Sequence, residues 1–353
     1  MHVNWVWDII KPLQRKKEEH SLKDIIALLK KGSMASLTAS IVNFFIAGLK
    51  GVAFILTANV AMFAEMMHSI GDALNQLFVF IGSGLSKKAP TERFPFGFGR
   101  LVNLVLLFAV IIVGILAYET VREGLHHILE PLPVETDTTM LLINIGVLAI
   151  AGVLETFVLY KAGKELLQQA DMPYDGLKPL TTSFANMDRA KPATKLVFLE
   201  DAVATGGALL AIIAILIARF TGFSQSEGIA SVIIGLAMFY IVYKIFMENA
   251  AGALGEHDPR MEERVSQIVL RHDEIKDIRK LFVIKEGDNL HAEVIAEIDP
   301  DLTSREVNRI RDEIEKMILK QQHVTDVNME FELNDGKRTW PKTQDDLDRK
   351  PKY

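Results

Sequence analysis

Residues 65–76 read EMMHSIGDALNQ, and they lie inside one of the most apolar parts of the chain, NVAMFAEMMHSIGDALNQLFVFIGSGL. Side chains three or four residues apart share one face of an α-helix, so Glu65, His68 and Asp72 lie along a single face. A charged side chain at the centre of a bilayer costs at least about 2.5 kcal/mol and seldom occurs without a partner or a task. The stretch therefore predicts a membrane helix whose polar face has a function.

The rest of the chain divides into an apolar part and a water-soluble part. It has 353 residues, 49% of them hydrophobic, and long apolar runs fill residues 34–250. Residues 257–353 are rich in Glu, Lys, Asp and Arg. About 20 consecutive apolar residues suffice to cross a bilayer as a helix, so the chain is expected to be a membrane protein with a soluble C-terminal part. The absence of cysteine excludes disulfides and thiolate metal ligands.

The apolar part predicts six spans, so both termini are expected on one side of the membrane. Lys and Arg gather in the N-terminal segment, in the link between spans two and three, and in the link between spans four and five. By the positive-inside rule, these links and both termini face the cytoplasm. No cleavable signal pattern is present, and a bacterial inner membrane is the expected location. The predicted spans are residues 34–56, 59–84, 101–125, 138–160, 195–219 and 226–247.

The polar face of span two has the chemistry of half a metal site. Imidazole and carboxylate groups are ordinary ligands for Zn²⁺ and similar ions, which makes His68 and Asp72 candidates. Span five, KLVFLEDAVATGGALLAIIAIL, supplies Glu200 and Asp201, followed by small residues that let helices approach closely. Neighbouring residues on a helix point about 100° apart, so only one of this pair should face the ion. The alternative is a polar clamp between helices without metal.

These features together resemble the cation diffusion facilitator family of divalent metal/proton antiporters. The resemblance rests on the HSIGDALNQ block, the loop LSKKAPTERFPFGFGR, the acidic block of span five and the soluble C-terminal part, and it covers roughly residues 34–333. The run MDRAKPATKLVFLEDAVATGG is most similar to the branch that contains the animal mitochondrial zinc transporter. The resemblance implies export of a divalent metal from the cytoplasm in exchange for protons, by a homodimer.

One departure from the family pattern affects the expected ligand set. Most zinc-transporting members place His or Asp one turn before the aspartate of span five, where this chain has Val197. His68, Asp72 and Asp201 remain as expected ligands. Zn²⁺ is the ion expected first, while an oxygen-rich site also suits Mn²⁺ or Fe²⁺. Candidates for the fourth ligand are Glu200, Glu65, Asn43, Asn75 or a water molecule.

The soluble part predicts a small α+β domain over residues 257–333. Helical and strand periodicities follow one another in the order αββαβ, and Thr303 with Glu306 predicts a capping box at the second helix. Residues 1–33 form the expected cytoplasmic N-terminal segment, residues 34–250 the transport domain and residues 334–353 a flexible tail. The positions that bind regulatory zinc in some family members hold Lys276, Asn308, Glu330 and Glu332 here, which argues against a strong zinc site in this domain.

Other functional classes receive less support from the residues. A membrane metallohydrolase should show a motif such as His-Glu-x-x-His, and none occurs. A dimeric scaffold or metal sensor that does not transport remains an alternative because of Val197. Glu119 and Glu155 are expected to form ion pairs with Lys50 or Arg122 rather than to carry ions. We expect no enzyme activity, no cofactor and no nucleic-acid partner; the expected partners are metal ions, protons and membrane lipid.

Overall fold

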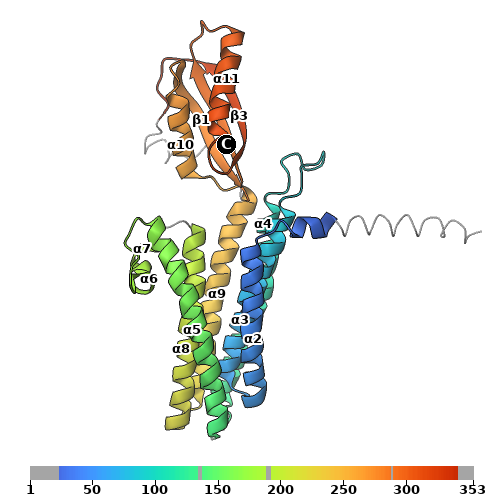
Figure 1. Cartoon of the computed structure of the whole chain (residues 1–353), viewed down its shortest axis with the longest axis vertical. Helices are drawn as coiled ribbons and strands as arrows, with labels where there is room; N and C mark the ends of the chain where they lie inside the picture. The colour runs from blue at the N-terminus through green and yellow to red at the C-terminus, as the bar shows by residue number, and fades with distance from the viewer. Residues whose placement is uncertain (1–23, 134–136, 188–191, 288, 341–353) are drawn as a thin grey trace, which may run out of the picture. The chain divides into compact units, whose positions relative to one another are not determined.

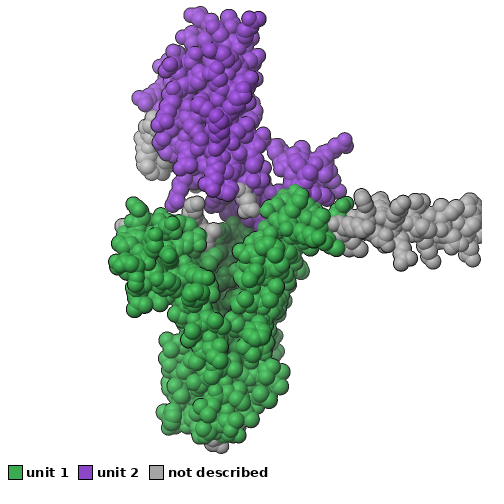
Figure 2. Space-filling view, in the orientation of Figure 1, with its two compact units in different colours: residues 1–87, 104–249 green, residues 88–103, 250–353 purple. Residues whose placement is uncertain are grey.

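The computed structural model describes residues 24–133, 137–187, 192–287 and 289–340. It separates into two compact units, which are coloured in Figure 2. Unit 1 comprises Met1–Lys87 and Leu104–Asn249, and unit 2 comprises Lys88–Asn103 and Ala250–Tyr353. Each unit is described by itself.

Long helices make up unit 1. Two short helices, α6 (Lys178–Thr181) and α7 (Ser183–Asn186), lie in the connection before α8. The side chains of Ser33 and Asn59 cap the amino ends of α2 and α3 by accepting backbone N–H groups. The long helices are α2 (Met34–Thr57), α3 (Val60–Leu85), α4 (Leu101–Leu129), α5 (Thr138–Gln169), α8 (Pro192–Thr221) and α9 (Gln225–Leu254).

Five of the described helices are long and apolar enough to cross a membrane: α2, α4, α5, α8 and α9. The prediction of six spans is therefore supported for five of them. The helix at the place of the second predicted span, α3, has 26 residues and is also long enough to cross. Its mean hydropathy is lower because His, Asn, Gln, Asp and Glu side chains occupy the face that the sequence analysis singled out.

Small residues bring the helices of unit 1 close together. Helix α2 packs along α3 and α5 along α8 (Figure 1). Between α2 and α3, the Ser40 hydroxyl donates to the carbonyl oxygen of Ala73 over 2.8 Å. Between α4 and α9, Gly124 and Gly228 approach so closely that a Cβ atom on either would meet the backbone of the other helix. Close approach of this kind is typical of helices in membranes.

Unit 2 contains the predicted αββαβ order of elements. Its elements are α10 (Pro259–Leu270), β1 (Ile275–Glu286), β2 (Asn289–Ile298), α11 (Ser304–Ile318) and β3 (Val324–Leu333). The sheet order is β1-β2-β3, with β1 antiparallel and β3 parallel to β2. The capping box predicted at Thr303 and Glu306 is present at the start of α11.

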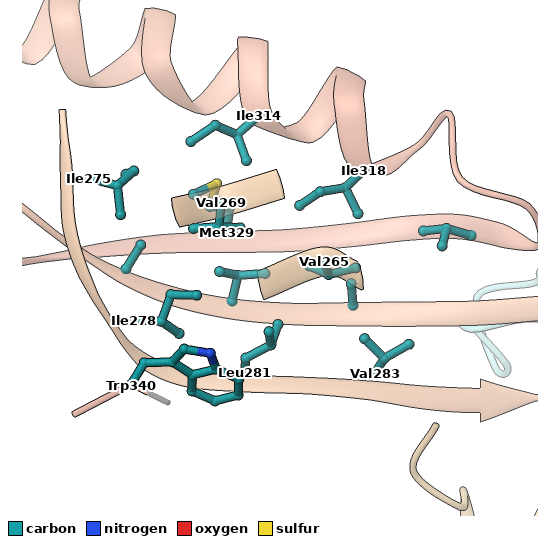
Figure 3. Packing of buried hydrophobic residues seen from close by; sticks show 14 of the residues in the cluster. Val265, Val269, Ile275, Ile278, Leu281, Val283, Ile314, Ile318, Met329 and Trp340 are labelled. Atoms are coloured by element: carbon teal, nitrogen blue, oxygen red, sulfur yellow. The ribbon is translucent and has the colours of Figure 1, made fainter. Parts of the chain in front are cut away.

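Apolar side chains from the helices and the sheet form the core of unit 2 (Figure 3). Trp340 belongs to this core and is only 7% exposed. Its backbone N–H and that of Thr339 both donate to the buried carboxylate of Asp277 on β1. The sequence analysis placed residues 334–340 in a flexible tail, but an indole that buries its large apolar surface holds this segment against the domain.

Candidate metal site

Helix α3 holds His68 and Asp72 on one face, as their spacing predicts. The distance from His68 Nε2 to Asp72 Oδ2 is 3.4 Å. The imidazole is buried, while the Asp72 side chain is 20% exposed. Among the described residues, His68 Nε2 has no hydrogen-bond partner. A buried nitrogen without such a partner remains able to bind a ligand that enters the helical bundle.

Helix α8 brings Glu200 and Asp201 to the same level. The Glu200 carboxylate is buried, accepts a hydrogen bond from Asn75 Nδ2 over 3.1 Å, and lies within hydrogen-bonding reach of Asp72. Asp201 is partly exposed and interacts electrostatically with both Glu200 and Asp72. The two acidic residues thus take different directions, and Glu200 is the one hydrogen-bonded to α3.

These side chains are neighbours, but they do not form a complete coordination shell. Over the part of the chain that the structure describes, no three His, Asp or Glu side chains converge closely enough to hold one metal ion. Asp72, Glu200 and Asp201 lie close to one another although carboxylates of like charge repel at short range. The geometry therefore shows Asp72 as a neighbour of His68 on α3 and of Glu200 and Asp201 on α8, and it leaves the ligand set a prediction.

Glu65, the remaining candidate ligand, takes part in an ion pair. It is fully buried, and its Oε2 lies 2.7 Å from Lys50 Nζ. Its Oε1 points at Gly207 of α8, where a Cβ atom would collide with it. One oxygen of Glu65 is thus bound to a cation within the chain, while the other has no hydrogen-bond partner among the described residues.

The two acidic residues for which pairing was predicted are paired. Glu155 Oε1 lies 2.9 Å from Lys50 Nζ, and Glu119 Oε2 lies 2.8 Å from Arg122 Nη2. Glu155 has a second property that the sequence did not reveal. It interacts electrostatically with Asp72 and Asp201, and its Oε2 has no hydrogen-bond partner among the described residues. The sequence indicated a possible ion pair here, because Lys50 in the first apolar span and Glu155 in the fourth are each the only charged residue of their span.

Val197, the residue at the expected fourth ligand position, is 45% exposed. At about 100° per residue, its direction on α8 falls between those of Glu200 and Asp201. Both of those side chains take part in the acidic group next to α3. The exposure of Val197 therefore indicates open space in front of this turn of the helix.

Comparison with known families matches two parts of the chain. The family described as "Cation efflux transmembrane domain" matches residues 36–252, and "Cation efflux protein, cytoplasmic domain" matches residues 258–333. A probable cation efflux system protein of Mycobacterium tuberculosis is 24% identical over 270 residues, which are 75% of this chain and 72% of that protein. The manganese efflux system protein MneS of Bacillus subtilis is 22% identical over 304 residues, 84% of this chain and 94% of that protein.

A mitochondrial relative is matched over a smaller share of its length. The proton-coupled zinc antiporter SLC30A9 of Homo sapiens is 25% identical over 264 residues, 74% of this chain and 44% of that protein. The chain therefore spans less than half of this relative. The family match over residues 36–252 includes α3 and α8, the helices that carry the acidic residues described above.

Proposed function

The chain belongs to the cation efflux family, and from this premise we propose that it moves a divalent metal ion out of the cytoplasm in exchange for protons. The family is one of transporters, and the apolar helices make the chain a multi-pass membrane protein. In this proposal α3, the second predicted span along the chain, also crosses the membrane and completes the set of six. The ion binds between α3 and α8. The expected ligands are His68, Asp72 and Asp201, with Glu200 as the first candidate for the fourth.

The observation that carries the proposal is the group of acidic side chains around Asp72, which is itself next to His68, within the helices of unit 1. Asp72, Glu200 and Asp201 interact with one another there, although like charges repel. A group of this kind is costly inside a membrane, and a divalent cation would neutralise it. Structural pairing alone accounts for Lys50 and Arg122 with their glutamates, but not for this excess of carboxylates.

The exchange for protons follows from ligand chemistry. Metal ligands must lose their protons before they bind, so metal and protons compete for the same groups. An imidazole ordinarily titrates near neutral pH, which suits His68 to this competition. If the site is exposed to each side of the membrane in turn, protons displace the metal on one side and metal displaces protons on the other.

Zn²⁺ is the ion proposed first, with Mn²⁺ and Fe²⁺ as alternatives. The names of the relatives include both a zinc antiporter and a manganese efflux protein. One imidazole among several carboxylates gives a donor set richer in oxygen than the two-nitrogen sites that zinc favours. We propose in addition that the cytoplasmic domain supports a homodimer and that both termini face the cytoplasm of a bacterial cell.

The test is metal uptake by proteoliposomes that carry a pH gradient, with Zn²⁺, Mn²⁺ and Fe²⁺ in competition. Transport predicts accumulation beyond the amount of protein present, and it predicts that uptake depends on the gradient. The second candidate function is a dimeric sensor or scaffold, which the absence of a ligand at Val197 favours. A sensor would bind metal only in proportion to its own amount, with no dependence on the gradient.

A further inference from the structure

Lys50 makes an unusual set of contacts in the interior of unit 1. Its side chain is 0% exposed, and Nζ donates hydrogen bonds to Glu65 Oε2 over 2.7 Å, to Ser69 Oγ over 2.9 Å and to Glu155 Oε1 over 2.9 Å. An ammonium group has three donors, so each of them has one acceptor. These contacts connect α2 to α3 and also to α5, which packs on α8.

The Lys50 contacts adjoin the candidate metal ligands and border a closed apolar end of the bundle. On α3, Glu65 precedes Asp72 by two turns, or roughly 10 Å along the helix. On the other side of Lys50 and Glu65 begins a cluster of buried apolar residues, most of them small, drawn from α2, α3, α5, α8 and α9. Its members are Ala53, Ala61, Met62, Leu148, Ala211, Ala214, Ile215 and Ala230.

Toward the opposite end of the same bundle, helices move apart. Helices α2 and α5 are close where α2 ends and α5 begins, where the hydroxyl of Thr57 lies 2.9 Å from Asn144 Oδ1, and they diverge toward the other end (Figure 1). Val197, which lies toward that other end of α8, is 45% exposed although it is on the helix face that carries Glu200 and Asp201. The candidate metal site is therefore open on one side and closed on the side of Lys50.

The stability of the fold does not by itself explain why the Lys50 ion pairs are present. Buried ion pairs lose much of their attraction to desolvation, and apolar residues of similar volume would stabilise the fold at least as well. Here Glu65 Oε1 and Glu155 Oε2 also have no hydrogen-bond partner among the described residues. A partly satisfied polar network is costly in a medium of low dielectric constant, so stability alone does not account for this connection between helices.

We propose that Lys50 is a positioning residue for transport: it ties the α2–α3 pair to α5 and so holds the pathway closed on one side of the metal site. Opening that side requires Glu155 to leave Lys50, because α5 and α2 must then separate. The inference rests on the proposed transport function, since a scaffold need not open to both sides.

Cysteine accessibility tests the proposal directly, because the chain has no native cysteine. Leu148→Cys reports on the closed side, where Leu148 is 0% exposed, and Val197→Cys reports on the open side. Each reporter is labelled in proteoliposomes with a membrane-impermeant maleimide. Glu155→Gln keeps the shape of the side chain, and Lys50→Met removes the charge. Both variants should raise the labelling rate of Leu148→Cys at least about tenfold and lower that of Val197→Cys. The reason is that the equilibrium shifts from the state that is closed on the side of Lys50 to the state that is open on that side.

Glu119→Gln is the matched control, since Glu119 pairs with Arg122 within one helix and connects no others. It should leave both labelling rates unchanged. The proposal is overturned if monodisperse Glu155→Gln protein has the labelling rates of the parent. It is also overturned if the labelling rates of both reporters rise together, which indicates general loosening.

If Lys50→Met does not fold, the labelling rates of Glu155→Gln alone test the proposal. Metal uptake is measured on vesicles that contain the parent protein. Absence of uptake by the parent, together with shifted labelling in the variants, contradicts the transport function only. Uptake by the parent, together with unshifted labelling in the variants, contradicts the role of Lys50 only.

Discussion

Asn75 on α3 donates a hydrogen bond from Nδ2 to Oε1 of Glu200 on α8, over 3.1 Å. This bond joins the two helices that carry the candidate ligands, and it fixes one oxygen of Glu200 while the carboxylate remains close to Asp72. Asn75 therefore orients Glu200, and in the proposed site its amide oxygen need not contact the ion.

The first prediction follows from this bond. Asn75→Ala should weaken metal binding by about tenfold, because a hydrogen bond to a charged group contributes about 1.5 kcal/mol. Asn43→Ala, which changes the other candidate amide ligand, should leave the affinity unchanged. Equilibrium dialysis of the purified protein measures both values, and an equal effect of the two substitutions would show that Asn75 has no special relation to the site.

The second prediction concerns Asp72. Asp72→Ala should abolish transport and leave the protein folded and dimeric, because a low-coordination site loses one of its few carboxylate ligands. Glu119→Gln, also a change of an acidic side chain within the membrane helices, should transport at the parent rate. Uptake of metal into proteoliposomes is the measurement. Near-parental uptake by the Asp72 variant would remove the basis for a metal site on α3.

The third prediction concerns the core of unit 2. Trp340→Ala should destabilise the domain by about 3–5 kcal/mol, the usual cost of deleting a buried aromatic side chain. Trp340→Phe keeps an aromatic ring in the same place and leaves a smaller cavity, so it should cost less than Trp340→Ala. Hydrogen exchange of β1 and β2 in the full chain measures both changes. Unchanged protection in Trp340→Ala would mean that the indole contributes nothing to the core.

The sequence predicted local features better than partnerships between distant helices. Periodicity on one helix placed His68 with Asp72, and the capping rule placed Thr303 with Glu306, because each pair is separated by only a single helical turn. Pairing of Glu119 and Glu155 with Lys50 or Arg122 was predicted, but not which acid meets which base: Lys50 and Glu155 are 105 residues apart, and their pairing depends on how two helices pack. A single-helix pattern contains no information about such packing.

The assignment of Trp340 to a flexible tail has a similar cause. The residues around it, NDGKRTW, are polar and rich in turn-forming types, so composition favoured an exposed segment. The structure instead uses the buried carboxylate of Asp277 to bind the backbone of this segment. A partner that lies 63 residues earlier in the chain could not be identified from local composition.

The fourth prediction uses pH. Hydrogen bonds from the side chain and backbone N–H of Thr303 lower the pKa of Glu306. Because the pKa is lower in the folded state, ionised Glu306 stabilises the domain above the ordinary glutamate range, and this contribution is lost as the pH falls through the lowered value. Glu306→Gln should therefore lower the thermal midpoint at neutral pH and have no effect at about pH 2, below the ordinary range of glutamate. Glu315→Gln in the same helix serves as the control, and a difference that persists at low pH would rule out this origin.

The last prediction concerns the position where a ligand is missing. Val197 lies one turn before Asp201, in a direction between Glu200 and Asp201, and it is 45% exposed, so a larger side chain has room there. Val197→His would give the site a second imidazole beside His68, and zinc favours tetrahedral sets of nitrogen and carboxylate ligands. We expect tighter zinc binding, a preference shifted toward Zn²⁺ over Mn²⁺, and slower release of the ion.

Glu200 provides the converse test of the same prediction. If Glu200 is the present fourth ligand, Glu200→Gln should weaken zinc binding in the parent protein and matter much less once residue 197 is His. A double-mutant cycle in zinc affinity measures this dependence, since two groups that compete for one coordination position cannot act additively. Val197→Thr, close in size to valine and without an imidazole, is the matched control and should leave the metal preference unchanged. Strict additivity together with an unchanged preference in Val197→His would mean that position 197 does not face the ion and that the assignment of ligands on α8 is wrong.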